Sequence, residues 1–268
     1  MIKDITLGQY FPGRSVVHKL DARIKIILTA FFIVLLFSAD SIWGLFVGIA
    51  FTIITFAITK IPWKLMGKCL KPIVPVIIFT AILNLFFIRT GKPYFEWKFI
   101  KITDEGVDTA VFMVIRIICL IVGTSLLTYT TSPIDLTDAI ERLLSPLKKI
   151  KIPVHELAMM MTIALRFIPT LIEETDKIMS AQKARGADME TGSIIKRAKA
   201  MIPILIPLFV ASFRHAEELA LAMECRCYHG GEGRTRMKQL KLSSRDLFAS
   251  VYVAIFFAAV IVTNVITK

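Results

Sequence analysis

The sequence predicts an all-α membrane protein with about five transmembrane helices and a cytoplasmic module of long amphipathic helices. The chain of 268 residues is 55% hydrophobic, with a mean hydropathy of +0.67, and is therefore more apolar than a soluble domain usually is. Several almost uncharged runs are long enough to cross a bilayer, which takes about 20 residues. We expect a membrane region with four spans at 1–131, cytoplasmic helices at 132–246 and a final span at 247–268.

Five apolar runs are expected to span the membrane. They are Ile24–Ala39, Ile42–Thr59, Ile73–Ile88, Val107–Thr130 and Leu247–Ile266. Only Asp40 and Ser41 join the first two runs, so these must form a tight hairpin. The third run begins beside Pro72 and contains Pro75, and neighbouring helices must satisfy the backbone groups that proline leaves unpaired, because lipid cannot do so.

The basic residues predict a cytoplasmic N-terminus and an external C-terminus, because cytoplasmic loops carry the excess of Lys and Arg. With that orientation, 26 of the 33 Lys and Arg residues fall on the inside. The inside segments are Met1–Arg23, Lys60–Lys71 and Ser132–Asp246. Lys25 and Arg116 lie within the spans. For Arg116 the ordinary explanations are snorkelling towards the outer surface or pairing with Asp108 or Glu105.

Several functional classes find no support in the sequence. The net charge of +12 is spread over loops without a basic face that carries aromatic residues, so nucleic acid is not an expected partner. No Gly-x-x-x-x-Gly-Lys-Ser/Thr motif occurs, so any ATP must be bound by another subunit. His155 is followed by Met159 where a zinc protease needs a second histidine, and Cys225, Cys227 and His229 lack a fourth ligand. We expect no catalytic residue, no metal site and no cofactor.

The segment Ser132–Asp246 is too long to be a simple connection, so it needs structure of its own. Three helices are predicted there, at about 132–144, 154–185 and 193–227. Pro169 is expected to kink the second helix, and Pro203 and Pro207 to bend the third. Gly186 is a natural C-terminal cap for the second helix.

The two long helices carry apolar stripes with a period near 3.5 residues. The stripes comprise residues 157, 161, 164, 168, 171, 178 and 179 in the first of the two, and 205, 209, 216, 219 and 223 in the other, with Ser212 in phase. Such stripes predict that the helices pack on each other like a coiled coil. Arg185 follows Ile178 by seven residues and Arg226 follows Leu219 by seven, so both arginines share the phase of the apolar stripe.

Each arginine lies between small residues at a helix end, in Ala184-Arg185-Gly186 and Cys225-Arg226-Cys227. One basic residue at a helix C-terminus complements the helix dipole, which contributes roughly 0.3–1 kcal/mol. Two copies in phase favour a further role. Small neighbours let another backbone approach, and arginine offers a planar fork for bidentate contacts that lysine cannot match. These six residues are the candidate docking site for a partner that works in pairs.

The two tripeptides resemble the paired signature of the transmembrane T component of energy-coupling factor (ECF) transporters, which are ABC-type importers of vitamins and trace metals. The segments Leu7–Ser15, His18–Lys25 and Leu165–Pro169 are similar to further motifs of that family. The resemblance spans the chain, and the motifs occur in the family's order. Cys225 and Cys227 depart from it, because the second copy often has alanine or glycine there; cysteine is also small, so docking is still expected.

This resemblance implies a subunit that binds neither substrate nor nucleotide. Two cytoplasmic ATPases would each receive one arginine-ended coupling helix in a surface groove. A separate substrate-binding membrane subunit, the S component, would sit against the apolar faces of the coupling helices. Closing of the ATPase pair on ATP would move these helices, and the S component would topple to release substrate inside. The implied location is the plasma membrane of a prokaryote, with lipid around the spans.

Six residues on or beside the two stripes are candidates for the contact with the S component. They are Met160, Met161, Leu165, Leu205, Phe209 and Phe213. Two packed helices cannot hide the whole of so wide an apolar face, and methionine suits a surface that repacks against different partners. Packing within this chain is the alternative for any single residue among them.

Two other functions stay open at this point. A self-sufficient secondary transporter would need inverted repeats and helices broken near the bilayer midplane, which five spans and one large cytoplasmic region do not favour. An intramembrane enzyme would need a catalytic group, and none is visible. The transported substrate is not encoded here, because specificity would belong to the S component.

Overall fold

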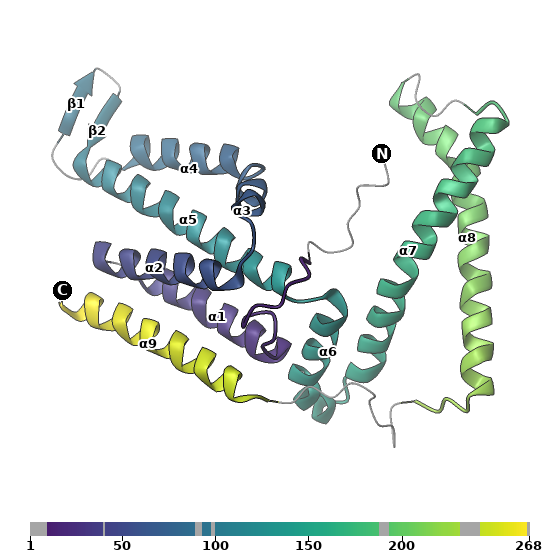
Figure 1. Ribbon diagram of the computed structural model, residues 1–268. Helices are drawn as coiled ribbons and strands as arrows, with labels where there is room; N and C mark the ends of the chain where they lie inside the picture. The colour runs from purple at the N-terminus through teal and green to yellow at the C-terminus, as the bar shows by residue number, and fades with distance from the viewer. Residues whose placement is uncertain are drawn as a thin grey trace. The chain divides into compact units, whose positions relative to one another are not determined.

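The computed structural model describes residues 10–39, 41–88, 93–97, 100–187, 193–230 and 242–266 (Figure 1). Its helices are α1 (Ala22–Ser38), α2 (Ile42–Thr59), α3 (Trp63–Leu70), α4 (Val74–Phe87), α5 (Asp104–Thr130), α6 (Pro133–Leu143), α7 (Val154–Ala184), α8 (Ile194–Cys225) and α9 (Ser244–Ile266), with a 3₁₀ turn at Ser145–Ile150. Two short antiparallel strands, β1 (Pro93–Trp97) and β2 (Ile100–Thr103), were not expected from the sequence. The predicted all-α class is otherwise confirmed.

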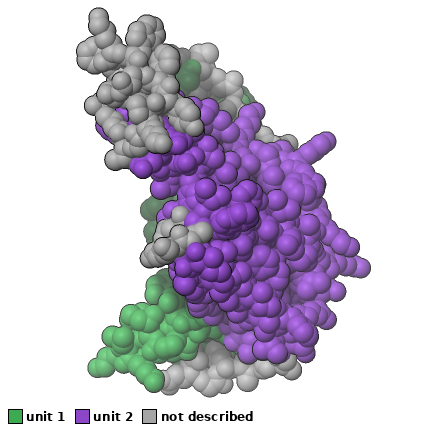
Figure 2. Space-filling model, turned by 90° about the vertical axis from the view of Figure 1, so that its left-hand side faces the viewer, with its two compact units in different colours: residues 1–7, 137–238 green, residues 8–136, 239–268 purple. Residues whose placement is uncertain are grey.

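The chain folds into two compact units, coloured separately in Figure 2. The bundle unit comprises residues 8–136 and 239–268, and the hairpin unit comprises residues 1–7 and 137–238. The chain passes between the units inside α6, whose start is capped by Ser132. The Ser132 hydroxyl accepts a hydrogen bond from the Asp135 backbone N–H at 3.1 Å and donates one to the Asp135 carboxylate at 2.8 Å. The boundaries expected at 131 and 247 stay a prediction.

Three helices of the bundle unit, α2, α5 and α9, are long and apolar enough to cross a membrane. α3 and α4 meet at a bend of 59° and together qualify as one further span. α1, with 17 residues, lies at the lower limit of the roughly 17–25 residues that a spanning helix takes. α7 also qualifies by length and composition, although the sequence predicts it as a cytoplasmic helix. The chain is a multi-pass membrane protein.

The core of the bundle unit forms where α1 contacts α2, α5 and α9. Its buried side chains are Phe32, Leu35, Leu36, Ala39, Phe51, Cys119, Val253 and Val260. The rings of Phe32 and Phe51 stack at 5.2 Å between centroids, and Phe51 stacks on Tyr252 at the same distance. Glycines let the helices approach: a methyl group at Gly48 would lie 2.7 Å from Leu36, and one at Gly123 would lie 2.1 Å from Phe32.

Polar contacts tie the start of α1 to the neighbouring helices. The Lys25 ammonium donates to the carbonyl oxygen of Thr130, at the end of α5, at 2.8 Å, and to that of His18 at 3.2 Å. The Asp21 backbone N–H donates to the Asp246 carboxylate of α9 at 2.9 Å, and Arg23 pairs with Asp21 at 2.7 Å. The segment His18–Lys25, singled out above as a motif, therefore anchors α1 to α5 and α9.

The other end of α1 is held by two side chains from the same neighbours. Arg116 of α5 donates to the carbonyl oxygen of Ala39, and Asn264 of α9 donates to that of Ser38. The guanidinium carbon of Arg116 also lies 4.9 Å from the centroid of the Phe112 ring. Arg116 thus satisfies backbone at the α1–α2 connection. The pairing with Asp108 or Glu105 considered above does not occur.

The packing at Gly123 predicts a destabilising substitution. A Gly123→Ala change places a methyl group against the Phe32 ring, and overpacking of this kind costs about 1–3 kcal/mol. Thermal unfolding of the purified protein in one fixed detergent measures the loss. Gly67→Ala in α3 is the matched control, because nothing lies within 4 Å of the added methyl group, and we expect it to be neutral or to gain up to about 1 kcal/mol. Equal effects of the two changes would contradict the close α1–α5 approach.

Candidate functional site

The two long helices of the hairpin unit, α7 and α8, run antiparallel and cross each other (Figure 1). Three contacts along the pair fix this order. Tyr228, just after α8, donates its hydroxyl to the sulfur of Met159 near the start of α7 at 3.0 Å. Near the middle, His215 contacts Glu174, and close to the end of α7 the Gln182 side chain reaches Pro203.

The contact at Pro203 follows from the sequence of α8. Proline has no backbone N–H, so Pro207 cannot donate to the carbonyl four residues earlier, which is that of Pro203. The side-chain amide of Gln182 donates to this carbonyl oxygen at 3.4 Å. α8 continues as one helix through Pro203 and Pro207, and one of the carbonyls that the prolines leave unpaired, that of Pro203, becomes a point of attachment for α7.

The buried face of α8 coincides only in part with the predicted stripe. Between Ile204 and Met223 the covered positions are Ile204, Leu208, Ala211, Ser212, His215, Leu219 and Met223, which recur at helical spacing. In α7, the stripe is exposed at its start and half-buried from Ile168 onward. The period was predicted correctly. Ser212, Leu219 and Met223 are half-buried as the stripe predicts, whereas Leu205, Phe209 and Ala216 are exposed.

A histidine–carboxylate pair holds the middle of the two helices together. His215 Nε2 lies 2.7 Å from Glu174 Oε1, and its Nδ1 lies 3.7 Å from Glu218. The hydrogen bond to Glu174 raises the pKa of His215 above its usual value of 6.5, with smaller contributions from the charges of Glu174 and Glu218 and an opposing one from desolvation. The Phe167 ring lies beside the imidazole, with 6.0 Å between centroids.

Arg185 is the C-terminal cap of α7 in a Schellman motif. Gly186 follows it in the left-handed conformation, with φ of +84°. The backbone N–H of Gly186 donates to Lys183 at 3.0 Å, and that of Ala187 donates to Gln182 at 3.0 Å. These are the two backbone bonds that define the motif. The backbone of the helix end therefore favours glycine at the third position of this tripeptide.

Arg226 ends α8 in the same way. The residue after it, Cys227, is left-handed with φ of +55°, its N–H donates to Glu224 at 2.8 Å, and the N–H of Tyr228 donates to Met223 at 3.0 Å. A non-glycine residue rarely takes this conformation, because its Cβ crowds the backbone. The third residue of each tripeptide thus has to adopt the left-handed conformation. Gly186 adopts it without strain, whereas Cys227 is strained in it.

The antiparallel order places the two arginines at opposite ends of the α7–α8 pair. Gln182 contacts Pro203, so Arg185 lies level with the first part of α8, and Arg226 lies at the other end. Roughly 40 Å of helix separates them, at about 1.5 Å per residue. All six residues of the two tripeptides are exposed. The two arginine ends are therefore exposed and lie far apart along the pair.

The six residues assigned to the S component fall into two patches. Met160 and Met161 are 55% and 44% exposed, and Leu165 is half-buried; this α7 patch lies towards the Arg226 end. The α8 patch is formed by Leu205, Phe209 and Phe213, which are 54%, 65% and 57% exposed, and lies towards the Arg185 end. Phe209 and Phe213 contact each other edge to face at 4.8 Å. The structure does not bring the two patches together.

The remaining candidate chemistry of the hairpin unit is structural. His155 Nδ1 lies 3.0 Å from Glu141, which links the start of α7 to α6. His229 Nδ1 lies 2.8 Å from the Cys227 carbonyl oxygen. Within the part of the chain that the structure describes, no three His, Cys, Asp or Glu side chains gather as metal ligands.

Comparison with known proteins gives a consistent result. The family described as "Cobalt transport protein" (CbiQ) matches residues 13–237. The "Energy-coupling factor transporter transmembrane protein EcfT" of Clostridium kluyveri is 57% identical over 252 residues, covering 94% of this chain and 93% of that protein. The proteins of the same name from Ruminiclostridium cellulolyticum and Bacillus subtilis are 54% and 46% identical over 261 and 259 residues, covering 97% of each chain.

Substitution of the left-handed residue is predicted to have opposite effects on the stability of the two helix ends. Gly186→Ala has room for its methyl group but must take a positive φ, so we expect it to destabilise the end of α7 by about 1 kcal/mol. Cys227→Gly relieves the same strain and should stabilise the end of α8 by a similar amount. Amide hydrogen exchange of the last turn of each helix measures both effects. A change of the same sign at both positions would refute the shared motif.

The His215–Glu174 pair predicts a pH dependence of helix pairing. Because the pKa of His215 is raised in the folded state, its contribution is fully present below the unfolded value of 6.5 and is lost as pH rises through the higher folded value. Hydrogen exchange around the middle of α8 should therefore be slower at about pH 6 than at about pH 9, after correction for intrinsic rates. The His215→Gln variant should lose this dependence, and its retention would locate the titrating group elsewhere.

Proposed function

Because this chain belongs to the CbiQ family and is a transmembrane component of energy-coupling factor transporters, we propose that it transmits the motion of two cytoplasmic ATPases to a substrate-binding membrane subunit. The observation that carries the proposal is the pair of matched helix ends. α7 and α8 finish in the same Schellman motif, each with an exposed arginine, at opposite ends of an antiparallel pair.

Each arginine end offers a compact contact to one ATPase. The Schellman motif uses backbone N–H groups alone, so the guanidinium is not consumed by capping. It can donate in a bidentate fashion to a carboxylate or to backbone carbonyls at the rim of a groove. The residues beside it, Ala184 and Gly186 on α7 and Cys225 and Cys227 on α8, are small enough for the helix tip to enter such a groove.

The α7–α8 pair must move as one body to transmit force. The Glu174–His215 contact, the Gln182–Pro203 contact and the covered face of α8 resist sliding of one helix along the other. Approach of two ATPases on ATP binding would displace both ends of this pair. Hydrolysis belongs to those subunits, and this chain acts as the non-catalytic coupling component.

The exposed apolar patches of the pair are proposed as the contact with the S component. The α8 patch (Leu205, Phe209 and Phe213) and the α7 patch (Met160, Met161 and Leu165) lie towards different ends, so one large partner would bridge them or use one alone. Apolar residues exposed at more than half of their surface favour an interaction site when they cluster. Displacing the helices would then tilt the bound subunit and release a vitamin or another micronutrient inside.

The proposed orientation places the N-terminus and both arginine ends in the cytoplasm of a prokaryote, and the C-terminus outside. The excess of Lys and Arg in the inside segments supports it. Copurification of the tagged full chain from its native membrane tests the proposal most directly. Recovery of two ATPases and a small membrane protein is expected. A chain that transports alone in proteoliposomes would instead be a self-sufficient secondary transporter.

Removing the docking arginines should uncouple the complex without unfolding this chain. Each of Arg185→Ala and Arg226→Ala removes a charge-assisted contact that contributes about 1.5–3 kcal/mol to binding, and the double variant should be worse than either single one. Affinity for the purified ATPases and ATP-driven uptake into vesicles measure the loss. Lys177→Ala, which removes an exposed cation of α7 eight residues before Arg185, is the matched control and should retain both. Full transport by the double variant would contradict the docking proposal.

Polar substitution of the two patches should separate binding of the S component from docking of the ATPases. We expect Phe209→Ser with Phe213→Ser to lose the S component during purification while both ATPases stay bound, because an apolar contact is replaced by hydroxyl groups. Met160→Ser with Met161→Ser tests the α7 patch in the same assay. Ile150→Ser, an exposed apolar residue outside both helices, serves as control. Loss of the ATPases with the membrane partner still bound would reverse the assignment.

A further inference from the structure

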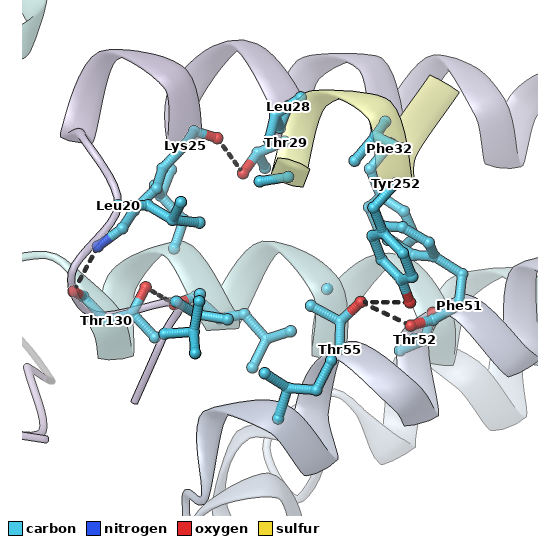
Figure 3. Close-up of a pocket in the computed structure, with 18 of the residues that line it drawn as sticks. Leu20, Lys25, Leu28, Thr29, Phe32, Phe51, Thr52, Thr55, Thr130 and Tyr252 are labelled. Carbon is cyan, nitrogen blue, oxygen red and sulfur yellow. Dashed lines mark hydrogen bonds between the residues drawn. The ribbon is translucent and has the colours of Figure 1, made fainter. Parts of the chain in front are cut away.

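The bundle unit contains a cavity of about 300 Å³ at the end where α1 and α9 begin and α2 and α5 finish (Figure 3). Four helices form its walls, and the segment before α1 closes one side with Val16, Val17 and Leu20. The volume lies at the lower end of the roughly 300–1,000 Å³ found for pockets that hold small ligands. Nothing in the proposed coupling mechanism uses this cavity.

The wall of the cavity is apolar even where its residues are nominally polar. Four threonines line it, and each hydroxyl donates to the carbonyl four residues earlier in its own helix. They are Thr29, Thr52, Thr55 and Thr130, with donor–acceptor distances of 2.7–2.8 Å. The Tyr252 hydroxyl lies 3.5 Å from that of Thr55. The hydroxyl hydrogens are therefore taken up within the helices, and an occupant meets mainly methyl groups, aliphatic chains and aromatic rings.

The rim of the cavity combines exposed apolar side chains with positive charge. Phe248, Val16 and Ile58 line it and are 73%, 56% and 42% exposed, so the cavity opens to the surface of the bundle. Arg245, in the first turn of α9, also lines it and is exposed. The buried ammonium of Lys25 lies in the wall at the same end.

Three described carboxylates near this end are already engaged by other partners. The Asp135 carboxylate accepts a hydrogen bond from the Ser132 hydroxyl at 2.8 Å. Asp21 forms an ion pair with Arg23 at 2.7 Å. The Asp246 carboxylate is buried and accepts the backbone N–H groups of Asp21 and Ser243 at 2.9 and 2.7 Å. The exposed guanidinium of Arg245 therefore marks the rim as a site for a negative group.

These observations restrict the occupant. Ordered water needs several polar partners, whereas most of this wall is apolar and the Lys25 ammonium already donates to the carbonyl oxygens of His18 and Thr130. A helix, about 10 Å across, is too wide for the cavity. An acyl chain is apolar, narrow and present on every side of a membrane-spanning bundle. We propose that the cavity takes one acyl chain of an anionic phospholipid, whose phosphate group lies against Arg245.

An anionic headgroup is favoured over a zwitterionic one, because a basic side chain at the membrane surface attracts net negative charge, whereas a choline group offsets its own phosphate. The bound chain would fill the space between α1, α2, α5 and α9 at one end of the bundle, where α1 is also held by Lys25 and Asp21. The site therefore links the lipid composition of the membrane to the packing of the helices that carry the hairpin unit.

Native mass spectrometry of the full chain, released from nanodiscs that contain equal amounts of phosphatidylglycerol and phosphatidylcholine with identical chains, tests the proposal. One retained phosphatidylglycerol is expected. Arg245→Gln should reduce the preference for it about fivefold, and Arg245→Lys should keep most of it. Ala249→Phe, which fills the cavity, should reduce retention of both lipids.

Matched controls separate the site from the surface of the bundle. Lys19→Gln removes an exposed cation that does not line the cavity, and Val262→Phe enlarges an exposed residue of α9 outside it, so both should behave as wild type. Helix content and elution volume confirm folding, and Ala249→Leu is a milder filling variant. Unchanged lipid retention in Arg245→Gln and Ala249→Phe would overturn the proposal. Displacement of the lipid by inorganic phosphate alone, or equal retention of diacylglycerol, would also overturn it.

Discussion

The carbonyl groups left unpaired at helix C-termini are the constraint on which the rest of this structure depends. Within a bilayer no water can satisfy them, so the protein must. At the end of α1 they receive Arg116 from α5 and Asn264 from α9, and at the end of α5 they receive Lys25 from α1. Each of these contacts joins two different helices. Satisfying the backbone therefore also fixes how the helices of the bundle are arranged.

The hairpin unit satisfies its helix ends with backbone groups instead. α7 and α8 close their last turns through Schellman motifs, so no side chain from elsewhere is needed at either end. Both ends stay exposed, and Arg185 and Arg226 project from them. Within α8 the carbonyl of Pro203 lacks a backbone donor, because Pro207 has no N–H, and Gln182 of α7 donates to it instead. Helix-end carbonyls are thus satisfied by side chains of other helices in the bundle, which holds those ends in place, and by local backbone groups in the hairpin unit, which leaves its ends accessible.

Much of this architecture could be predicted from sequence, because apolar runs and helix breakers act locally. The span Ile42–Thr59 coincides with α2, and α7 and α8 begin and end within two residues of expectation. The α8 stripe was wrong at Leu205 and Phe209, because these residues are apolar without being covered, and hydrophobicity alone does not distinguish a packed face from one left for a partner. The role of Arg116 and the cavity could not be foreseen, because both depend on helices distant in sequence.

The two exposed cysteines on either side of Arg226 have a practical consequence for spectroscopy. Cys225 and Cys227 are exposed, whereas Cys119 is buried and Cys69 lies within hydrogen-bonding distance of Tyr129. The two exposed thiols thus lie at one end of the α7–α8 pair, Cys69 is half-buried, and the other tripeptide contains no cysteine. A thiol-reactive fluorophore or spin label would mark that end without engineering. Two helix ends that are alike in backbone geometry can thereby be told apart in the same molecule.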